Sequence, residues 1–462
     1  MKTIVDPQHA LGEGLDAIRT EFQVPTGFPR DVVAAAETAA RRAPTAHVDR
    51  TAHMFVTLDP ATSTDLDQAF AIEKAGEGAG ADMLLHYAIA DVAWFVDDGD
   101  AIDREAWRRG ETLYLPDGKA GLYPPVLAEG AASLLPDGDR PAIIFTVRVD
   151  PAGAVLLDGV ERALIRSRAK LAYSSVTEAD LPAGFAEISA RISADELRRG
   201  AARVDPPEQE IERVDGKLTL RFRPRVWAED RNAALSLATN MAVGKALLAH
   251  ETGLFRVMDA PDAEAVARLR LTARAFGLGW DAATPLDAFT RTLDASDPRS
   301  AAFMLAVRRA GHGASYAPYR DGRVPYHAAV AATYAQATAP LRRLADRYVI
   351  RAALAVANGQ PVPDVVSAAF ETLPKVMARA DATAGRIDRA AIDLAEAVML
   401  EGRVGETFAG VVTNVDERGG QIQLGDVPIV ARVKTDALPG SELSVKLDAV
   451  DVAKRMVRFT VG

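Results

Sequence analysis

The chain has 462 residues, of which 48% are hydrophobic and 26% charged, as in an ordinary globular protein of two or three domains. Its net charge of −10 excludes a generally basic coat, so a path for nucleic acid must be locally basic. Cysteine is absent, which excludes disulfides, thiolate metal sites and a cysteine nucleophile. No apolar run could span a bilayer and no secretion signal is visible, so we expect a cytoplasmic monomer without membrane contact.

The N-terminal part of the chain is predicted to be helical. Helices are expected at residues 11–22 and 31–43, with Pro44 after the second. Residues 1–50 are too few for a large core of their own, so we interpret them as a helical segment packed on the main domain. A small helix-turn-helix unit is the alternative.

Three carboxylates, Asp59, Asp65 and Asp67, lie within nine residues of the segment HMFVTLDPATSTDLDQAFAIE (53–73). The apolar runs on either side predict two buried strands joined by a polar loop. Carboxylates this close repel one another and stay ionised together only when a cation shares the charge. Such oxygen ligands suit Mg²⁺ or Mn²⁺ and a substrate phosphate. The cluster therefore favours phosphodiester chemistry, and a solvated Asp-rich turn is the competing interpretation.

The rest of the chain up to residue 400 alternates strands and helices. A hairpin is predicted around Asp215-Gly216, because Asp-Gly suits a tight turn between strands. Helical patterns occupy residues 231–250 and 262–276, and residues 365–400 should form one or two long helices. Strands early and helices late predict an α+β domain with a mixed sheet and packed helices.

The segment ATAPLRRLADRYVIR (337–351) predicts a helix capped by Thr338 with Pro340 in its first turn. Four arginines belong to it: Arg342, Arg343, Arg347 and Arg351. The last three repeat every four residues and would share a face, and the first lies near the positive end of the helix. Guanidinium groups gathered there suit phosphate. The competing interpretation is a solvated basic face paired with Asp346.

Two further sets of basic residues alternate along predicted strands: Arg166, Arg168 and Lys170, then Arg221, Arg223 and Arg225. Side chains that alternate on a strand project to one side, and a cationic sheet face could follow an RNA backbone. An ordinary polar outer face explains either set equally well.

Residues 401–462 change in character, with short Val-rich strands separated by Gly, Pro and Asp turns. They resemble the RNA-binding OB-fold β-barrel first named for a ribosomal protein. Where that family places base-stacking aromatics, this chain has Arg418 and Gln421, and its two aromatics, Phe408 and Phe459, are expected in the core. We therefore expect weak, mainly electrostatic RNA binding, or a structural lid.

The stretch TLDPATSTDLDQAF resembles the signature of the ribonuclease II / ribonuclease R (RNB) family. Further blocks follow in that family's order: HYAIADVAWFV, YLPDGKAGLYPPVLAEGAASLLPDGDRPAIIF, IRSRAKLAY, SLATNMAVGKAL and ATAPLRRLADRYVIR. The resemblance implies an RNB catalytic domain over residues 51–400, followed by the OB-fold. In that family two cold-shock domains usually precede the catalytic domain, and residues 1–50 are too few for them.

The resemblance also implies an activity. The family hydrolyses single-stranded RNA processively from its 3′ end and releases nucleoside 5′-monophosphates. On this chain it implies that the three aspartates and Arg342 are catalytic, with the aspartates and Gln68 holding Mg²⁺ or Mn²⁺. Tyr114 would stack on the terminal base. The remaining RNA-binding residues are expected to be Arg166, Arg168, Arg343 and Arg347.

Some positions depart from the family's pattern. Gln68 stands where the family has a fourth Asp, so the site loses a negative charge and we expect a raised metal requirement, with Mn²⁺ preferred. Ala339 and Leu344 replace the family's Ser and Tyr beside the arginines. A catalytically impaired RNA-binding relative is therefore the alternative function, and a metal-dependent phosphohydrolase of small nucleotides is a third.

Two further expectations concern single residues. The histidines show no paired metal spacing, so His53, His86 and His327 are expected to be satisfied hydrogen-bonding residues rather than ligands. Asp388 lies near where the family carries a late acidic residue by the leaving group, in a helix that can be aligned in more than one register.

Overall fold

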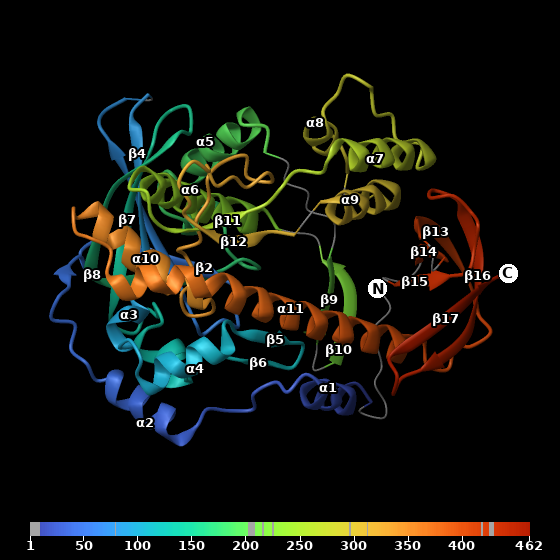
Figure 1. Cartoon of the computed structure of the whole chain (residues 1–462), viewed down its shortest axis with the longest axis horizontal. Helices are drawn as coiled ribbons and strands as arrows, with labels where there is room; N and C mark the ends of the chain where they lie inside the picture. The colour runs from blue at the N-terminus through green and yellow to red at the C-terminus, as the bar shows by residue number, and fades with distance from the viewer. Residues whose placement is uncertain are drawn as a thin grey trace.

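The structure is a computed structural model that describes residues 10–78, 80–201, 208–214, 217–223, 226–294, 297–311, 313–416, 419–424 and 429–462. A large sheet with packed helices forms one end of the molecule, and a small sheet forms the other (Figure 1). The long helix α11 (Asp364–Leu400) runs from one to the other. None of the described helices is both long and apolar enough to cross a membrane.

The large sheet consists of β1 (Val48–Asp49), β2 (Phe55–Asp59), β3 (Gln68–Ala75), β4 (Asp82–Ala90), β7 (Asp139–Val149) and β8 (Val155–Ala172). Its order is β1-β8-β2-β3-β4-β7, and β7 also pairs with β8. The long strand β8 makes this possible, because its first part pairs antiparallel with β7 and its last part pairs parallel with β2. The pairings from β8 through β2, β3, β4 and β7 therefore close into a ring.

The two faces of this sheet have different neighbours. Phe70 on β3 lies opposite Tyr87 on β4, and Phe70 stacks on Phe185 of α5 (Phe185–Arg198), with 5.4 Å between ring centroids. The helix α6 (Trp227–Ala249) lies against β4, β7 and β8. Because side chains alternate along a strand, the neighbouring pair Ala71 and His86 points to the opposite face.

The remaining elements before α11 are α1 (Ala10–Glu21), α2 (Arg30–Ala39), α3 (Val92–Phe95), α4 (Ala101–Arg109), β5 (Leu113–Leu115), β6 (Gly118–Ala120), the π-helix η1 (Leu127–Ala131), the 3₁₀-helix η2 (Glu178–Asp180), β9 (Glu208–Val214), β10 (Lys217–Arg223), β11 (Leu254–Val257), α7 (Ala263–Ala275), α8 (Leu286–Thr290), α9 (Pro298–Ala310), β12 (Ser315–Pro318) and α10 (Leu344–Ala357). The strands β9 and β10 form the predicted antiparallel hairpin. Its turn residues Asp215 and Gly216, like Arg225, lie outside the described residues.

The two N-terminal helices join different hydrophobic clusters. Leu15 and Ile18 of α1 are buried in a cluster with Leu394 of α11. Val32 and Ala36 of α2 belong to the main core, together with the strands of the large sheet. Each helix therefore packs on the main domain separately.

The prediction for residues 365–400 is resolved as one helix, because α11 continues through Pro374 for 37 residues. Its last residue, Leu400, is fully buried in the core of the small sheet. The side chain of Glu396 accepts a hydrogen bond from Val430 N at 3.1 Å. The long helix is therefore tied directly to the C-terminal sheet.

The C-terminal sheet has five antiparallel strands: β13 (Thr407–Asp416), β14 (Gly419–Leu424), β15 (Val430–Val433), β16 (Glu442–Asp451) and β17 (Met456–Val461). Their order is β15-β14-β13-β16-β17, and the edge strands β15 and β17 approach each other, as in a nearly closed barrel. Phe408 and Phe459 are buried edge to face with 5.8 Å between centroids, so their predicted core position is confirmed. Arg418 lies outside the described residues, and Gln421 accepts a hydrogen bond from Arg309 of α9. The predicted α+β domain and C-terminal OB-fold are confirmed.

Candidate active site

The loop that carries Asp65 and Asp67 is fastened to the body of the protein at three points. Leu66 between them is fully buried, its N–H donates to Ser133 Oγ at 2.9 Å, and its carbonyl accepts from Leu134 N at 3.0 Å. Ala90 N donates to the carbonyl of Asp67 at 2.9 Å. The loop is therefore fixed in place and is not a solvated turn.

Asp67 links this loop to the segment before α10. The residue is only 6% exposed, and its Oδ1 accepts a hydrogen bond from Leu341 N at 2.7 Å. Its Oδ2 lies 3.7 Å from Nε of Arg342, whose side chain remains 42% exposed. A buried carboxylate thus holds a guanidinium that can still meet a ligand from solvent.

Asp59 ends β2 and completes the carboxylate set. It is half-buried, and its Oδ2 has no hydrogen-bond partner within the described residues. Burial and the charge of Asp65 raise the pKa of Asp59 to about 7, and burial raises the pKa of Asp67 to about 8. A divalent cation would remove this penalty, since it favours the ionised form of both groups. The donor set therefore fits the predicted hard cation.

Asp65 already has a cationic partner. Lys119 Nζ lies 2.8 Å from Asp65 Oδ1 and 3.0 Å from Glu129 Oε1 of the π-helix η1. Lys119 and Glu129 carry no signal in the sequence, because only the fold brings them to the loop. The ammonium balances part of the charge at the loop. Asp59 and Asp67, whose pKa values are raised, are therefore the carboxylates that a bound cation would stabilise most in their ionised form.

Lys119 and Tyr114 come from one short hairpin, β5–β6, where they are directly paired. Tyr114 is 55% exposed. Partial burial and the charge of Asp65 raise the pKa of its hydroxyl, and the charge of Arg342 opposes this shift. An aromatic ring that is both exposed and beside the carboxylates is available to stack on a ligand. The base-stacking role of Tyr114 stays a prediction.

The hairpin is held beside Arg342 by backbone hydrogen bonds. Thr112 N donates to the carbonyl of Arg342 at 3.0 Å, and Leu344 N donates to the carbonyl of Gly110 at 3.0 Å. Gly110 has a φ of +81°, and a Cβ there would lie 2.9 Å from Cβ of Ala380 on α11. Only glycine fits such a position comfortably. The two backbone hydrogen bonds therefore hold the hairpin beside the Arg342 segment, and the glycine lets α11 pack closely against their junction.

The predicted start of the arginine helix at Thr338 is wrong, because α10 begins at Leu344. The Thr338 hydroxyl is 2.9 Å from Ser236 Oγ and accepts from Asn240 Nδ2 at 3.2 Å, so it bonds α6 instead of capping a helix. Asp346 Oδ2 accepts a hydrogen bond from Ala339 N at 2.8 Å, which stabilises the turn before the helix. Arg342 therefore lies in this turn, ahead of the helix end to which it was assigned.

Arg343 and Arg347 were predicted to bind RNA, and both point inward. Arg343 forms a two-point ion pair with Asp346, at 2.9 and 2.7 Å. Arg347 is 2% exposed and pairs with Asp103 of α4. These are buried ion pairs that fix α10 in the core. The predicted RNA contact is therefore wrong for Arg347 and finds no support for Arg343.

Gln68 is held at both ends of its amide. Its Nε2 donates to the carbonyl of Thr338 at 2.7 Å, and its Oε1 accepts a hydrogen bond from the hydroxyl of Tyr87. The oxygen expected to ligate metal thus already has a donor, so this arrangement argues against Gln68 as a metal ligand. Instead the amide connects β3 to the arginine segment, next to Asp67.

A cavity of about 370 Å³ opens on α6 beside this centre, and its lining includes Gln68, Tyr173, Asn232 and Arg342. Asn232 Nδ2 donates to Tyr173 Oη at 2.8 Å and to the carbonyl of Leu58 at 3.2 Å. The cavity is polar and lies beside the guanidinium and the strand end that carries Asp59. It can admit a charged group of nucleotide size.

The alternation predicted for residues 166–170 is present in β8, where Arg166 and Arg168 are exposed and Lys170 is half-buried. Arg166 Nε donates to Asp139 at 2.6 Å, and Arg168 bonds the carbonyl of Thr51. Lys170 acts electrostatically on Asp59, so this strand leads toward the carboxylates. Arg221 and Arg223 lie on β10, and their side chains are outside the described part of the structure.

Acidic residues near the arginines were missed by the sequence analysis. Burial and Asp381 raise the pKa of Glu111 to about 7. Asp381 on α11 forms an ion pair with Arg256 at 3.1 Å. Asp388, which was aligned with the family's late acidic residue, is exposed on the same helix. Asp381 is therefore an α11 carboxylate that the structure connects electrostatically to this region.

The prediction that the histidines are satisfied is wrong for two of them. His86 Nε2 and His327 Nδ1 are buried without a hydrogen-bond partner within the described residues. Burial and Arg256 lower the pKa of His327 to about 4, so its ring is neutral at physiological pH. His86 lies in a cluster with His53 and Glu73 on the large sheet.

The RNB domain family matches residues 48–358, and the C-terminal S1 domain of RNase II-type exonucleases matches residues 406–462. The chain belongs to the RNB family. Ribonuclease R of Aquifex aeolicus is 26% identical over an alignment of 464 positions, gaps included. The alignment covers 93% of this chain and 64% of that protein. The chain thus spans less than two thirds of the length of this relative.

Two solved structures have a similar fold. Mycoplasma genitalium RNase R, in complex with ribose methylated single-stranded RNA, aligns with a TM-score of 0.86 and 19% identity over 100% of this chain and 79% of that one. Yeast Ssd1, described as a pseudonuclease, aligns with a TM-score of 0.66 and 19% identity over 98% of this chain and 58% of that one. At this identity the likeness shows the fold alone, and proteins of the same fold include one described as a pseudonuclease.

Proposed function

We propose that the chain is a metal-dependent exoribonuclease that hydrolyses single-stranded RNA processively from its 3′ end. The observation that carries the proposal is the convergence of Asp67 with Leu341 N and Arg342 from a segment more than 270 residues away. Family membership supports the same chemistry, because the RNB domain family matches this chain and a relative that aligns with most of it is named ribonuclease R. The products would be nucleoside 5′-monophosphates.

Each residue of the centre has a proposed task. Asp59, Asp65 and Asp67 would hold Mg²⁺ or Mn²⁺, which supplies Lewis-acid activation of water and neutralises phosphate charge when bound. Arg342 would bind the terminal phosphodiester and stabilise the charge that develops in the transition state. Tyr114 would stack on the last base and so set which phosphate lies over the carboxylates. Arg166 and Arg168 would contact the RNA backbone further along.

The test uses 3′-labelled and 5′-labelled single-stranded RNA with purified protein and Mg²⁺ or Mn²⁺. We expect immediate release of labelled mononucleotide from the 3′ label, and conversion of the 5′ label to a short end product without a ladder. Asp67→Asn should abolish both, and Asp31→Asn, at an exposed position of α2, should abolish neither. Release of mononucleotide from the 5′ label first would contradict the proposed direction.

A catalytically impaired RNA-binding protein is the second candidate, and two observations favour it. Gln68 contributes no negative charge where the resembled family has an Asp, and Lys119 already pairs with Asp65. Both features weaken the attraction of the site for a second cation. Tight RNA binding without any product, including with Mn²⁺, would support this candidate and exclude the nuclease.

A phosphohydrolase of small nucleotides is separated from both by substrate length. A processive nuclease holds the RNA between successive cuts, so its rate should rise with RNA length up to the length of the binding path. A rate that is equal for dinucleotides and for long RNA would favour the small-molecule enzyme.

A further inference from the structure

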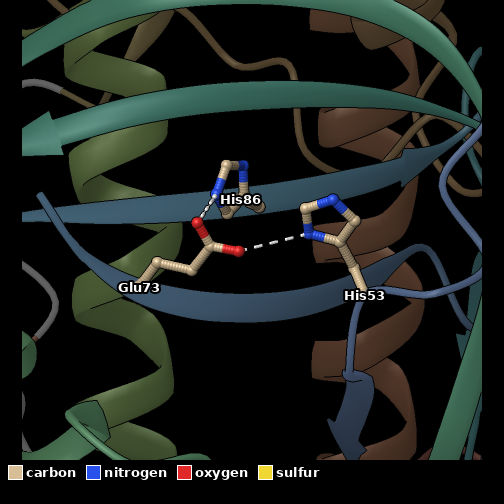
Figure 2. A group of neighbouring side chains, drawn as sticks. All are labelled: His53, Glu73 and His86. Atoms are coloured by element: carbon tan, nitrogen blue, oxygen red, sulfur yellow. Dashed lines mark ion pairs between the residues drawn. The ribbon is translucent and has the colours of Figure 1, made fainter.

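A second group of ligating side chains lies on the large sheet, on the face opposite to α5 and α6. It consists of His53 just before β2, Glu73 on β3 and His86 on β4. Figure 2 shows the carboxylate of Glu73 between the two imidazole rings, which turn their nitrogens toward it. Three separate chain segments therefore bring their polar ends together, and each imidazole turns one nitrogen toward a different oxygen of the carboxylate.

The strand register explains how this group is built. Ala71 of β3 pairs with His86 of β4, so Glu73, two residues further along, is on the same face as His86 and diagonal to it. Thr146 of β7 pairs with His86 on its other side. These neighbours arise from the pairing of buried strands, so the group is fixed by the core of the sheet.

The nitrogen–oxygen distances within the group are longer than those of ordinary hydrogen bonds, and each involves a different oxygen of Glu73. His53 Nδ1 lies 3.5 Å from Glu73 Oε1, and His86 Nε2 lies 3.4 Å from Glu73 Oε2. Nitrogen and oxygen in a hydrogen bond are usually about 2.7–3.2 Å apart. Two ligands bound at about 2.0–2.2 Å to a tetrahedral Zn²⁺ are separated by about 3.3–3.5 Å. The ligand atoms of all three residues lie within 4.8 Å of one another.

The orientation of His86 is a second, independent observation. Its Nδ1 lies 3.3 Å from Thr146 Oγ1, whereas its buried Nε2 faces Glu73 without any hydrogen-bond partner in the described part of the chain. Metal-binding histidines typically use one nitrogen for the metal and the other for an orienting partner.

We propose that His53, Glu73 and His86 bind one Zn²⁺ ion, with solvent in the fourth position. Two imidazoles and one carboxylate form the ligand set that Zn²⁺ prefers over Mg²⁺. The accessible side chain of Glu73, which is 52% exposed, leaves an entry path for the ion. The bound ion would fasten the entry to β2 onto β3 and β4, six residues before Asp59 in the sequence.

This site is distinct from the aspartate centre, and its test needs no RNA. Tag-free protein is titrated with Zn²⁺ by calorimetry in excess Mg²⁺, which occupies the carboxylate-only centre. We expect one equivalent of Zn²⁺ to bind. His53→Gln and Glu73→Gln should each weaken binding by more than the roughly 10- to 100-fold that loss of an outer partner produces. His250→Gln and Glu77→Gln, which alter exposed residues, are the matched controls and should bind like the natural protein.

Cobalt provides a spectroscopic signature of the same site. Co²⁺ bound by two imidazoles and a carboxylate in a four- or five-coordinate site should give strong visible absorption, which an octahedral carboxylate site does not. The absorption should disappear in His86→Asn and persist in Asp67→Asn. Circular dichroism of the metal-free variants shows that each is folded. Equal Zn²⁺ affinity in the natural protein, His53→Gln and Glu73→Gln would overturn the proposal, whether or not the protein cleaves RNA.

Discussion

Two sets of side chains lie around β2, β3 and β4, and they differ in ligand type and in accessibility. Where β2 ends and β3 begins, the carboxylate of Asp67 is almost fully buried and lies beside Arg342. Further along β3, Glu73 is half exposed and lies between two imidazoles. The first set suits a hard cation together with a phosphate, and the second suits Zn²⁺. The position along the shared strands therefore decides the partner, because it sets which ligand types are brought together.

The largest effect is expected from Asp67→Asn. Loss of this carboxylate removes a proposed metal ligand and leaves Arg342 without its buried partner. A loss of roughly 4 kcal/mol of transition-state stabilisation corresponds to about a thousandfold lower kcat/KM. Single-turnover hydrolysis of labelled RNA measures it. An Asp67→Asn enzyme of nearly natural activity would contradict the assignment of the reaction centre to the three aspartates.

Arg342→Ala should reduce kcat by about a hundred- to a thousandfold, as is typical when one donor to a developing charge is lost. Arg342→Lys should recover only part of this, because an ammonium lacks the planar fork that meets two phosphate oxygens. Arg351→Ala is a control, since Arg351 pairs with Asp98. Equal losses for Arg342→Ala and Arg351→Ala would indicate a structural effect instead.

The raised pKa values predict an unusual pH dependence of the metal-free protein. Asp59 and Asp67 have folded pKa values of about 7 and about 8, above the unfolded value of 3.8. The folded state therefore binds more protons between about pH 4 and 8, so the free energy of unfolding should fall by several kcal/mol as pH rises through this window. Urea denaturation in chelator at pH 5.5 and 8 measures the fall.

The same experiment has a matched comparison. Asp67→Asn carries no titrating group at this position, so its stability should depend less on pH. Mg²⁺ should stabilise the natural protein more at pH 8 than at pH 5.5, because binding requires ionised carboxylates. A pH dependence that is identical in both proteins would show that these aspartates are not the cause.

Tyr114→Ala should weaken binding of single-stranded RNA by about 1–3 kcal/mol, the usual contribution of one stacked base, or roughly 5- to 150-fold. Tyr114→Phe keeps the ring and should bind like the natural protein. Fluorescence anisotropy with labelled RNA in the absence of divalent cations measures both. If both variants lose affinity equally, the hydroxyl is what matters and stacking is excluded.

The smallest effect is a thermal shift that tests whether the two sets are independent. One equivalent of Zn²⁺ should raise the Tm of the natural protein and of Asp67→Asn by the same few degrees, since a bound ligand stabilises the folded state by mass action. His86→Asn should lose the shift. Loss of the shift in Asp67→Asn would mean that Zn²⁺ binds at the aspartates. The two sets of side chains would then not differ in the metal that they bind.

Much of the fold followed from local patterns. Three predicted features appear where they were expected: the strands on either side of Asp65, the two strands of the hairpin and the Ala-rich late helix. They were predictable because strand alternation and helix periodicity depend on neighbouring residues. The start of α10 did not follow. The hydroxyl of Thr338 could cap a helix locally, but partners on α6 take it instead.

The spacing of the three aspartates was enough to favour phosphodiester chemistry, because charge repulsion between close carboxylates is a property of the sequence itself. The role expected for the LeuArgArg segment came from the family resemblance. Which arginine remains open to a ligand was decided only by the tertiary structure. Arg347 is buried against Asp103 and Arg342 stays exposed beside Asp67, although both lie in one short segment. The lysine on Asp65 and the His53–Glu73–His86 group likewise depend on strand register and on long-range packing, which bring together residues whose separation in sequence carries no signal.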